Sequence, residues 1–187
     1  PTKFVKNPTN YFKAISYAGD GTSGRAISTG FEPGLIWIKD YDAGWSAVAD
    51  VVRGAGFLIS SNDAGAEANG SDEQTAVSAI GSTSFTIGQT PNAWYVNRDI
   101  SGSSYSPYNN VAWVWHAGDT TVTNNDGTIA SQVRANPACG FSIAEVDSTS
   151  SSNGTFGHGL GQQPELVLFK NLDNAYNWDV YMSIEGY

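Results

Sequence analysis

The fold is decided by the stretch Gly30-Phe31-Glu32-Pro33-Gly34-Leu35-Ile36-Trp37-Ile38-Lys39-Asp40, a glycine–proline turn that leads into a short apolar strand. The chain repeats it as Gly159-Leu160-Gly161-Gln162-Gln163-Pro164-Glu165-Leu166-Val167-Leu168-Phe169-Lys170-Asn171, with two residues inserted before the proline. In each copy a phenylalanine lies eighteen residues before the first glycine and a tryptophan follows the strand: Phe12 and Trp45, then Phe141 and Trp178. The chain therefore begins the same β unit twice.

The two copies lie about 130 residues apart, which exceeds the period of a solenoid repeat and matches tandem whole domains. We expect an N-terminal arm or linker at residues 1–10, a β-sandwich domain at 11–137, and the beginning of a second, truncated copy at 138–187. The second copy ends soon after Trp178, which predicts a piece of a longer chain. It also lacks strands that should cover its core, so we expect it to pack on the first domain or to use neighbouring chains.

The composition favours a β-rich protein with many turns. Of the 187 residues, 40% are hydrophobic and 12% aromatic, but only 14% are charged, against roughly 25% in ordinary soluble domains. The net charge of −9 would repel phosphate backbones, so we expect no nucleic-acid partner. No apolar run approaches the length of a membrane span, which predicts no membrane insertion. The single cysteine, Cys139, excludes an internal disulfide.

Short alternating runs bounded by turn residues indicate an all-β fold of about ten strands, a sandwich or a barrel. A two-layer jelly-roll sandwich is the better interpretation, because large aromatic residues at inward positions suit a core between two sheets. In one such run, Val111, Trp113 and Trp115 share a face of a half-buried strand. The expected strands are 11–17, 35–39, 47–52, 57–60, 75–80, 84–87, 93–96, 111–116, 127–133 and 140–146.

Groups that could perform catalysis are sparse. His116 ends an aromatic strand and His158 lies in a glycine-dense turn, and neither belongs to a zinc-binding spacing. A glycosidase needs two convergent carboxyl groups, and the sequence cannot show which of its carboxylates converge. The candidates for such a pair are Asp40, Asp42, Asp50, Glu67, Asp72, Glu73 and Asp99.

Three groups of residues are candidates for binding or for local structure. Asp50 and Arg53 are three residues apart after a strand, which predicts a structural ion pair or, alternatively, a ligand-contacting pair. The turns 61–63 and 124–127 supply oxygen atoms of the kind that calcium prefers, although no calcium-binding loop motif is present; we expect no other cofactor. Aromatic side chains near a Ser/Gly-rich segment could stack on sugar rings or fill the core: Trp94, Tyr95, Tyr105 and Tyr108.

An ordered series of motifs runs along almost the whole chain. It comprises Tyr17-Ala18-Gly19-Asp20-Gly21, the stretch 30–39, Asp50-Val51-Val52-Arg53-Gly54-Ala55, Leu58-Ile59-Ser60-Ser61-Asn62, Val111-Ala112-Trp113-Val114-Trp115-His116-Ala117-Gly118, Asn125-Asp126-Gly127-Thr128-Ile129, Gly140-Phe141-Ser142-Ile143, Gly157-His158-Gly159-Leu160-Gly161 and Asn177-Trp178-Asp179-Val180-Tyr181. This series resembles a repeated domain of tail-fibre and other virion appendage proteins of marine tailed bacteriophages, including cyanophages. The second copy departs from it, since residues 145–149 stand where the first copy has its Tyr-x-Gly-x-Gly turn.

The resemblance implies a concanavalin-like β-sandwich in long, often trimeric virion proteins, with no established enzymatic role. We therefore expect a virion structural protein, a tail fibre or another surface appendage, that presents β-sandwich domains for host attachment. Its expected partners are other virion proteins, further copies in a homotrimer, and host surface polysaccharide. The alternatives are an architectural spacer or anchor without a ligand, and an enzyme that depolymerises host glycan.

Overall fold

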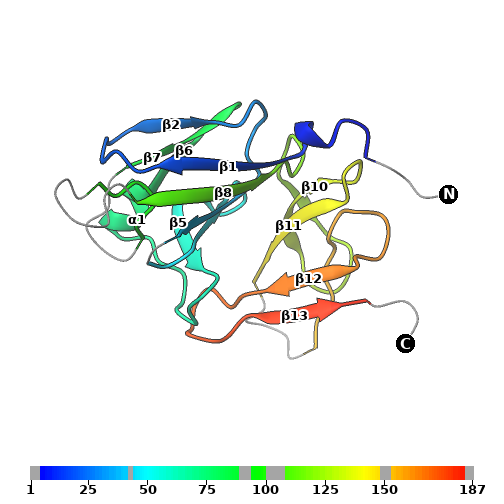
Figure 1. Ribbon diagram of the computed structural model, residues 1–187. Helices are drawn as coiled ribbons and strands as arrows, with labels where there is room; N and C mark the ends of the chain where they lie inside the picture. Colours follow the sequence, from blue (N-terminus) through cyan, green and yellow to red (C-terminus); the bar gives the residue numbers. More distant parts are fainter. Residues whose placement is uncertain (1–4, 42–43, 89–93, 100–107, 148–152, 184–187) are drawn as a thin grey trace.

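The computed structural model describes residues 5–41, 44–88, 94–99, 108–147 and 153–183. Their fold is all-β, as predicted, apart from one short 3-10 helix and one short α-helix (Figure 1). Neither helix is long and apolar enough to cross a membrane. The elements are η1 (Pro8–Asn10), β1 (Phe12–Ala18), β2 (Arg25–Ser28), β3 (Leu35–Asp40), β4 (Ala47–Asp50), β5 (Gly54–Ser60), α1 (Ser71–Ala76), β6 (Val77–Ile80), β7 (Ser84–Ile87), β8 (Asn109–Trp115), β9 (Val122–Asn124), β10 (Ser131–Asn136), β11 (Phe141–Val146), β12 (Leu166–Phe169) and β13 (Asp179–Met182).

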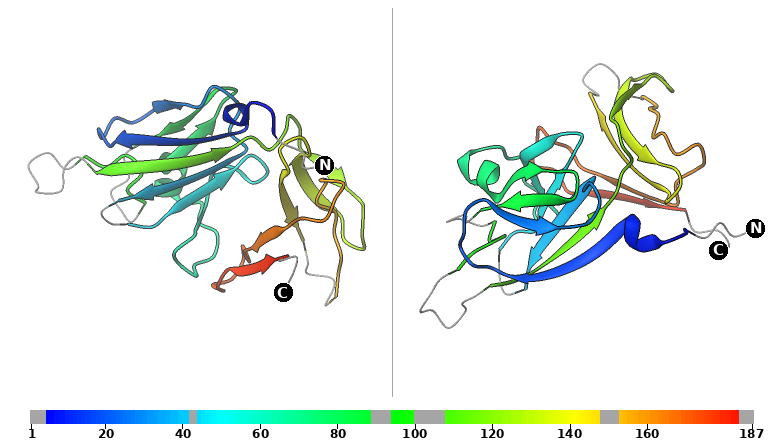
Figure 2. Two further views of the ribbon diagram at one scale, coloured as in Figure 1. Left: turned by 45° about the vertical axis from the view of Figure 1, so that its right-hand side comes forward. Right: turned by 90° about the horizontal axis from the view of Figure 1, so that it is seen from above.

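Two antiparallel sheets form a β-sandwich. The larger has the strand order β1-β8-β3-β4-β5 and the smaller has the order β2-β7-β6, and the views in Figure 2 show them as two layers. β8, from late in the chain, lies between β1 and β3 and pairs with both, Trp113 lying opposite Ala14 on one side and Trp37 on the other. The sandwich therefore cannot form until residues about 75 positions apart in sequence have met.

The core between these sheets is built from small and branched side chains. Ile36 and Ile38 of β3 and Val114 of β8 are almost fully buried, and they face Phe85 and Ile87 of β7 within one cluster. The expectation that the large aromatics point inward was wrong for β8. Ala112 and Val114 fill the core instead, while Trp113 and Trp115 lie half-buried on the outer face. Two closely packed sheets leave room for small residues at the centre of the larger sheet.

The first turn of the repeated motif requires glycine. Gly30 has φ 77° and its counterpart Gly159 has φ 72°, a backbone conformation that other residues adopt at a cost. At Gly34 a Cβ would lie 2.5 Å from the backbone nitrogen of Ala117, so the turn approaches the end of β8 too closely for a side chain. The glycines thereby set β3 against β8.

The remaining strands form two small antiparallel sheets, with the orders β11-β10-β9 and β12-β13 (Figure 1). β10 comes from the first expected unit and β11 from the second, and they pair over their whole length from Ser131–Val146 to Asn136–Phe141. Phe141 also stacks on Trp115 of the sandwich, with ring centroids 5.8 Å apart. The outer face of the larger sheet is therefore in contact with the C-terminal part at this end.

Three expected strands differ from the structure. The run 127–133 becomes a strand only at Ser131, where β10 begins. The run 75–80 begins as the end of α1 and becomes β6 only at Val77, and residues 94–99 form a turn instead of a strand. At α1, Thr75 donates a hydrogen bond to the Ser71 carbonyl, a local contact within the helix. At the 94–99 turn, the Asn97 side chain donates to the Thr22 carbonyl, 75 residues earlier in the sequence.

Candidate functional site

The structure brings together two of the four aromatic residues predicted to contact a ligand. The ring centroids of Tyr95 and Tyr108 lie 5.6 Å apart with an angle of 36° between the planes. The guanidinium carbon of Arg98 lies 4.3 Å from the Tyr95 centroid and 5.5 Å from that of Tyr108. A cation over the face of an aromatic ring is attracted by its quadrupole. We call Tyr95, Arg98 and Tyr108 the Tyr–Arg cluster.

A buried asparagine holds this cluster against the end of β1. The amide nitrogen of Asn97 donates to Asp20 Oδ1 (3.2 Å) and to the Thr22 carbonyl (2.9 Å), and its oxygen accepts from Arg25 Nη1 (3.0 Å). The hydrogen bond from the Thr22 backbone N–H lowers the pKa of Asp20, and Asn97 and Arg25 lower it further. The carboxylate is thus kept charged beside Arg25. The segment that presents Tyr95 and Arg98 is therefore fixed in place.

The cluster combines two phenol rings with one guanidinium, and its exposure is uneven. Tyr108 is 7% exposed, whereas Tyr95 and Arg98 are half-buried. A half-exposed ring beside a guanidinium can stack on a ligand and donate hydrogen bonds to it.

The other two predicted aromatics do not join the cluster. Trp94 is 4% exposed, donates from Nε1 to Glu73 Oε1 (2.7 Å), and packs edge-on against Trp45 at 5.4 Å. An enclosed ring has no free face for a sugar, so Trp94 serves the core. Tyr105 lies outside the described residues.

Asp50 and Arg53 form a buried ion pair at the β4–β5 corner. Arg53 Nε lies 2.7 Å from Asp50 Oδ2, and Arg53 Nη1 lies 2.8 Å from Glu67 Oε1. Asp50 Oδ1 also accepts the backbone N–H groups of Val52 and Arg53, both at 2.9 Å. Burial by itself would lower the pKa of Arg53, but the two carboxylates outweigh burial and raise it. The pair closes a tight corner and presents no free charge to a ligand.

Glu145 on β11 has a carboxyl pKa shifted by its surroundings. Burial raises its pKa, and the negative charges of Asp50 and Glu67 raise it further, while Arg53 partly offsets them. Glycosidases use a carboxyl group with a raised pKa next to a second carboxylate. Here both neighbouring carboxylates are bonded to Arg53, so neither is a free base.

A groove of about 550 Å³ lies beside His116 and is lined by Tyr11, Asp119 and Asn136 among others. The ring Nδ1 accepts the Gly118 backbone N–H at 3.2 Å, and Nε2 lies 3.6 Å from Asp119 Oδ1. The Cys139 thiol donates to the backbone carbonyl of His116, not to its ring, and burial raises the pKa of that thiol. Activation of a thiol requires contact with the imidazole or a lowered pKa, so this group is not arranged as a nucleophile.

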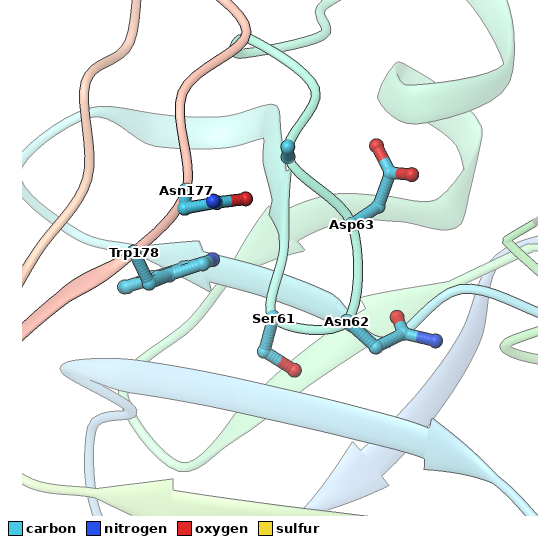
Figure 3. A pocket seen from close by; sticks show the side chains of 6 residues that line it. Ser61, Asn62, Asp63, Asn177 and Trp178 are labelled. Atoms are coloured by element: carbon cyan, nitrogen blue, oxygen red, sulfur yellow. The ribbon is translucent and has the colours of Figure 1, made fainter.

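The predicted calcium turn at residues 61–63 borders a shallow pocket of about 280 Å³, together with Asn177 and Trp178 (Figure 3). In Figure 3 the side chains of Asn62 and Asp63 point away from each other. Asn62 Oδ1 instead accepts hydrogen bonds from Ser46 N and Ser60 Oγ, both at 2.8 Å. Within the described ranges no three His, Cys, Asp or Glu side chains are grouped as metal ligands.

The sequence analysis missed one aromatic surface. Trp37 and Trp113 meet edge-to-face on the outer face of the larger sheet, with centroids 5.8 Å apart, and Phe12 and Trp115 continue the row at 4.9 Å. Phe12 is 39% exposed and the three tryptophans are half-buried. The alternation of Trp113 and Trp115 was the available signal. The sequence did not indicate which face of β8 points outward, because both faces of this strand are apolar.

These features define an all-β sandwich protein. The chain belongs to the family described as Domain of unknown function (DUF7483), which matches residues 7–185. No curated protein and no solved structure matches the chain.

Proposed function

We propose that this protein is a bacteriophage virion structural protein, a tail fibre or another surface appendage, that presents jelly-roll, concanavalin-like sandwich domains for host attachment. The observation that carries the proposal is the duplicated strand framework. β1, β3 and β4 of the first unit correspond to β11, β12 and β13 in sequence, and the hairpins β3–β4 and β12–β13 are both antiparallel, with Leu35 opposite Asp50 and Leu166 opposite Met182. Reuse of one module along a chain is typical of an extended assembly.

The surface chemistry supports recognition of host polysaccharide. With 14% charged residues, the chain relies on hydroxyl, amide and aromatic groups, which bind neutral sugars by hydrogen bonds and stacking. Tyr95 and Arg98 offer such groups on one fixed segment. The partners in this proposal are other virion proteins, two further copies in a homotrimer, and host glycan. Nucleic acid is no partner, given the net charge of −9.

A phage adsorption experiment tests the proposal. Gold-labelled antibody against the chain should decorate an appendage of intact particles, and the purified chain, added to host cells first, should slow adsorption. A Tyr95→Ala, Arg98→Ala chain should compete less well. A chain that labels no particle contradicts the virion assignment, and labelled particles without competition contradict attachment.

The architectural alternative has its own supporting observation, the exposed aliphatic face of the hairpin β12–β13, formed by Leu166, Leu168, Val180 and Met182. It predicts that the antibody labels particles at a joint between virion proteins and that the purified chain does not slow adsorption. Together these results indicate a spacer or anchor. The depolymerase alternative relies on Glu145 alone. It predicts new reducing ends when the chain is incubated with host polysaccharide, and loss of them in Glu145→Gln.

A further inference from the structure

Arg98 differs from the other three arginines of the chain, because among the described residues it has no carboxylate partner. Each of the others forms an ion pair: Arg25 with Asp20 at 3.4 Å, Arg53 with Asp50 at 2.7 Å and Glu67 at 2.8 Å, and Arg134 with Glu32 at 2.8 Å. The chain has 18 acidic and 9 basic residues, so an arginine without a carboxylate is the exception. Its guanidinium is available to an anion from outside.

The hydrogen-bond donors of the Tyr–Arg cluster are free but fixed in position. The guanidinium carbon of Arg98 lies 4.3 Å from the Tyr95 ring centroid, and a guanidinium stacked on a ring keeps the N–H donors at its rim. Those donors form a planar fork that matches a carboxylate. The Tyr95 hydroxyl also makes no hydrogen bond within the described ranges. Because Asn97 anchors the backbone between these two residues, little ordering remains to be done when a ligand binds.

The cluster lies at the end of the sandwich that is remote from the C-terminal strands. At one end of β1, Trp115 pairs with Phe12 and stacks on Phe141 of β11. Beyond the other end of β1, the Gly19 N–H donates to the Tyr108 carbonyl at 2.7 Å. The strand between these ends spans about 20 Å. In Figure 1, β11, β12 and β13 lie on the far side of the sandwich from the end of β1. The free guanidinium therefore belongs to the first unit alone.

The size and chemistry of the cluster suit one sugar residue. Three side chains cover far less than the area of about 800 Å² that each partner contributes to a stable protein interface. A half-exposed phenol ring can stack on the apolar face of a pyranose, and its hydroxyl can donate a hydrogen bond to the sugar. A carboxylate on the same pyranose would meet the guanidinium in a charge-assisted pair. A uronic acid carries both features.

The acidic surface limits how many carboxylates the ligand can carry. With a net charge of −9, the chain repels a densely charged polymer, and one guanidinium neutralises one carboxylate. A single carboxylate is tolerated, because exposed charges more than about 8 Å away are largely screened at physiological ionic strength. Asp20, which Asn97 holds beside this segment, is already paired with Arg25. The ligand that fits is a glycan with isolated uronic acids among neutral sugars.

We propose that the Tyr–Arg cluster binds a uronic acid residue of an otherwise neutral glycan. Arg98 pairs with the carboxylate, Tyr95 stacks on the pyranose ring, and Tyr108, which is 7% exposed, supports the guanidinium from the buried side. This inference rests on the proposed role in host attachment and names the class of sugar that the site recognises.

Matched pairs of methyl glycosides are the probes: glucuronide with glucoside, galacturonide with galactoside, and mannuronide with mannoside. Within each pair a carboxylate replaces a hydroxymethyl group and nothing else changes. Titrated into the full chain and followed by NMR at the Arg98 Nε–H and the Tyr95 ring, at least one uronide should bind saturably. Its affinity should exceed that of its neutral partner by at least about tenfold, and added sodium chloride should weaken it.

Variants separate recognition by the fork from general attraction to a cation. Arg98→Met should abolish the preference for the uronide, and Arg98→Lys, which keeps the charge without the planar fork, should lose most of it. Lys170→Met removes one positive charge from the second hairpin and is the matched control, so its preference should equal that of the unmodified chain. Amide spectra unchanged outside the cluster show that each variant is folded. Acetate, a carboxylate without a ring, should bind at least about tenfold more weakly than the uronide.

Four outcomes overturn the proposal. One is that no uronide binds more tightly than its neutral partner, and another is that the preference survives in Arg98→Met. The third is equal binding of acetate, which means that the site holds an anion and no sugar. The fourth is tighter binding of a capped glutamate peptide than of every uronide, which indicates an acidic protein partner.

These outcomes are separable from failure of the proposed function. A chain that binds no uronide but still labels particles and slows adsorption contradicts the sugar class and leaves host attachment intact. A chain that binds a uronide through Arg98 but labels no particle supports the ligand and contradicts the virion assignment.

Discussion

The hairpins β3–β4 and β12–β13 share a sequence pattern and antiparallel pairing but differ in burial. Ile36 and Ile38 are 0% and 1% exposed, whereas their counterparts Val167 and Phe169 are half-buried and 43% exposed. The difference lies in the surroundings: β3 lies between two strands and under a second sheet, and β12 has one neighbouring strand. Local sequence thus sets how a hairpin pairs, and the strands around it set how stable it is.

The largest expected effect comes from the ion pair at the β4–β5 corner, which follows the first hairpin. Arg53→Met leaves the Asp50 and Glu67 carboxylates buried without their cation and should lower the free energy of unfolding by about 3–5 kcal/mol. Urea titration measures it. Lys170→Met on the second hairpin, where the ammonium is bonded to exposed carbonyls, is the matched control and should cost less than about 0.5 kcal/mol.

Core truncation should separate the two hairpins next. Ile36→Ala should destabilise the protein by about 2–5 kcal/mol, since it leaves a cavity among fully buried neighbours. Val167→Ala, the corresponding change in β12, should cost less than about 1 kcal/mol because its site is half-open. Equal losses in urea titration contradict the comparison.

Alkaline pH should act on the first unit through Tyr17. Its hydroxyl donates to the Val96 carbonyl at 2.7 Å, and burial raises its pKa well above the usual value. The unfolded chain releases this proton near pH 10 while the folded chain retains it. Stability is therefore complete below pH 10 and falls above it, by up to about 1.4 kcal/mol per pH unit.

Tyr17→Phe removes this part of the pH dependence, although it also loses a hydrogen bond at neutral pH. Unfolding free energies measured from pH 8 to 11 should fall less steeply in the variant. The second copy has no tyrosine in the corresponding stretch, residues 145–149. Parallel slopes for the two proteins contradict the assignment to Tyr17.

The smallest effect concerns the attachment of the second hairpin to the sandwich. Trp178 Nε1 donates to the Ser60 carbonyl at 2.8 Å, at the end of the edge strand β5. Trp178→Phe should weaken this attachment by about 1 kcal/mol. Exchange of β12 and β13 amides should accelerate about fivefold, while that of β3 amides stays unchanged. Acceleration in both hairpins argues against separate stabilities.

Sequence reasoning predicted the repeated strands well because a glycine–proline turn followed by alternating apolar residues is a local signal. It failed where long-range packing decides. The direction of Trp113 depends on which face of β8 meets the second sheet, and both faces are apolar. Tyr95 and Tyr108 were named as candidates, but Arg98, which lies over both rings, was not. The position of Arg98 over these rings depends on the hydrogen bond from Asn97 to a turn about 75 residues earlier in the sequence.

The ion pair at the β4–β5 corner shows the same difference between local and long-range contacts. The spacing of Asp50 and Arg53 indicated their ion pair, because three residues after a strand allow a tight turn to close. Glu67 and Glu145 reach that corner from a loop and from β11, and no local pattern announces either one. Sequence therefore identified the residues whose partners are near in the chain.

Native-state hydrogen exchange of backbone amides tests the central claim, that one strand pattern has two stabilities in this chain, most directly. Ile36 and Ile38 should exchange only through global unfolding, with a free energy equal to that from urea titration and sensitive to denaturant. Leu166 and Leu168 should exchange at least about a hundredfold faster, through openings that denaturant hardly affects. Equal exchange free energies for both pairs, with the same denaturant dependence, would contradict the account.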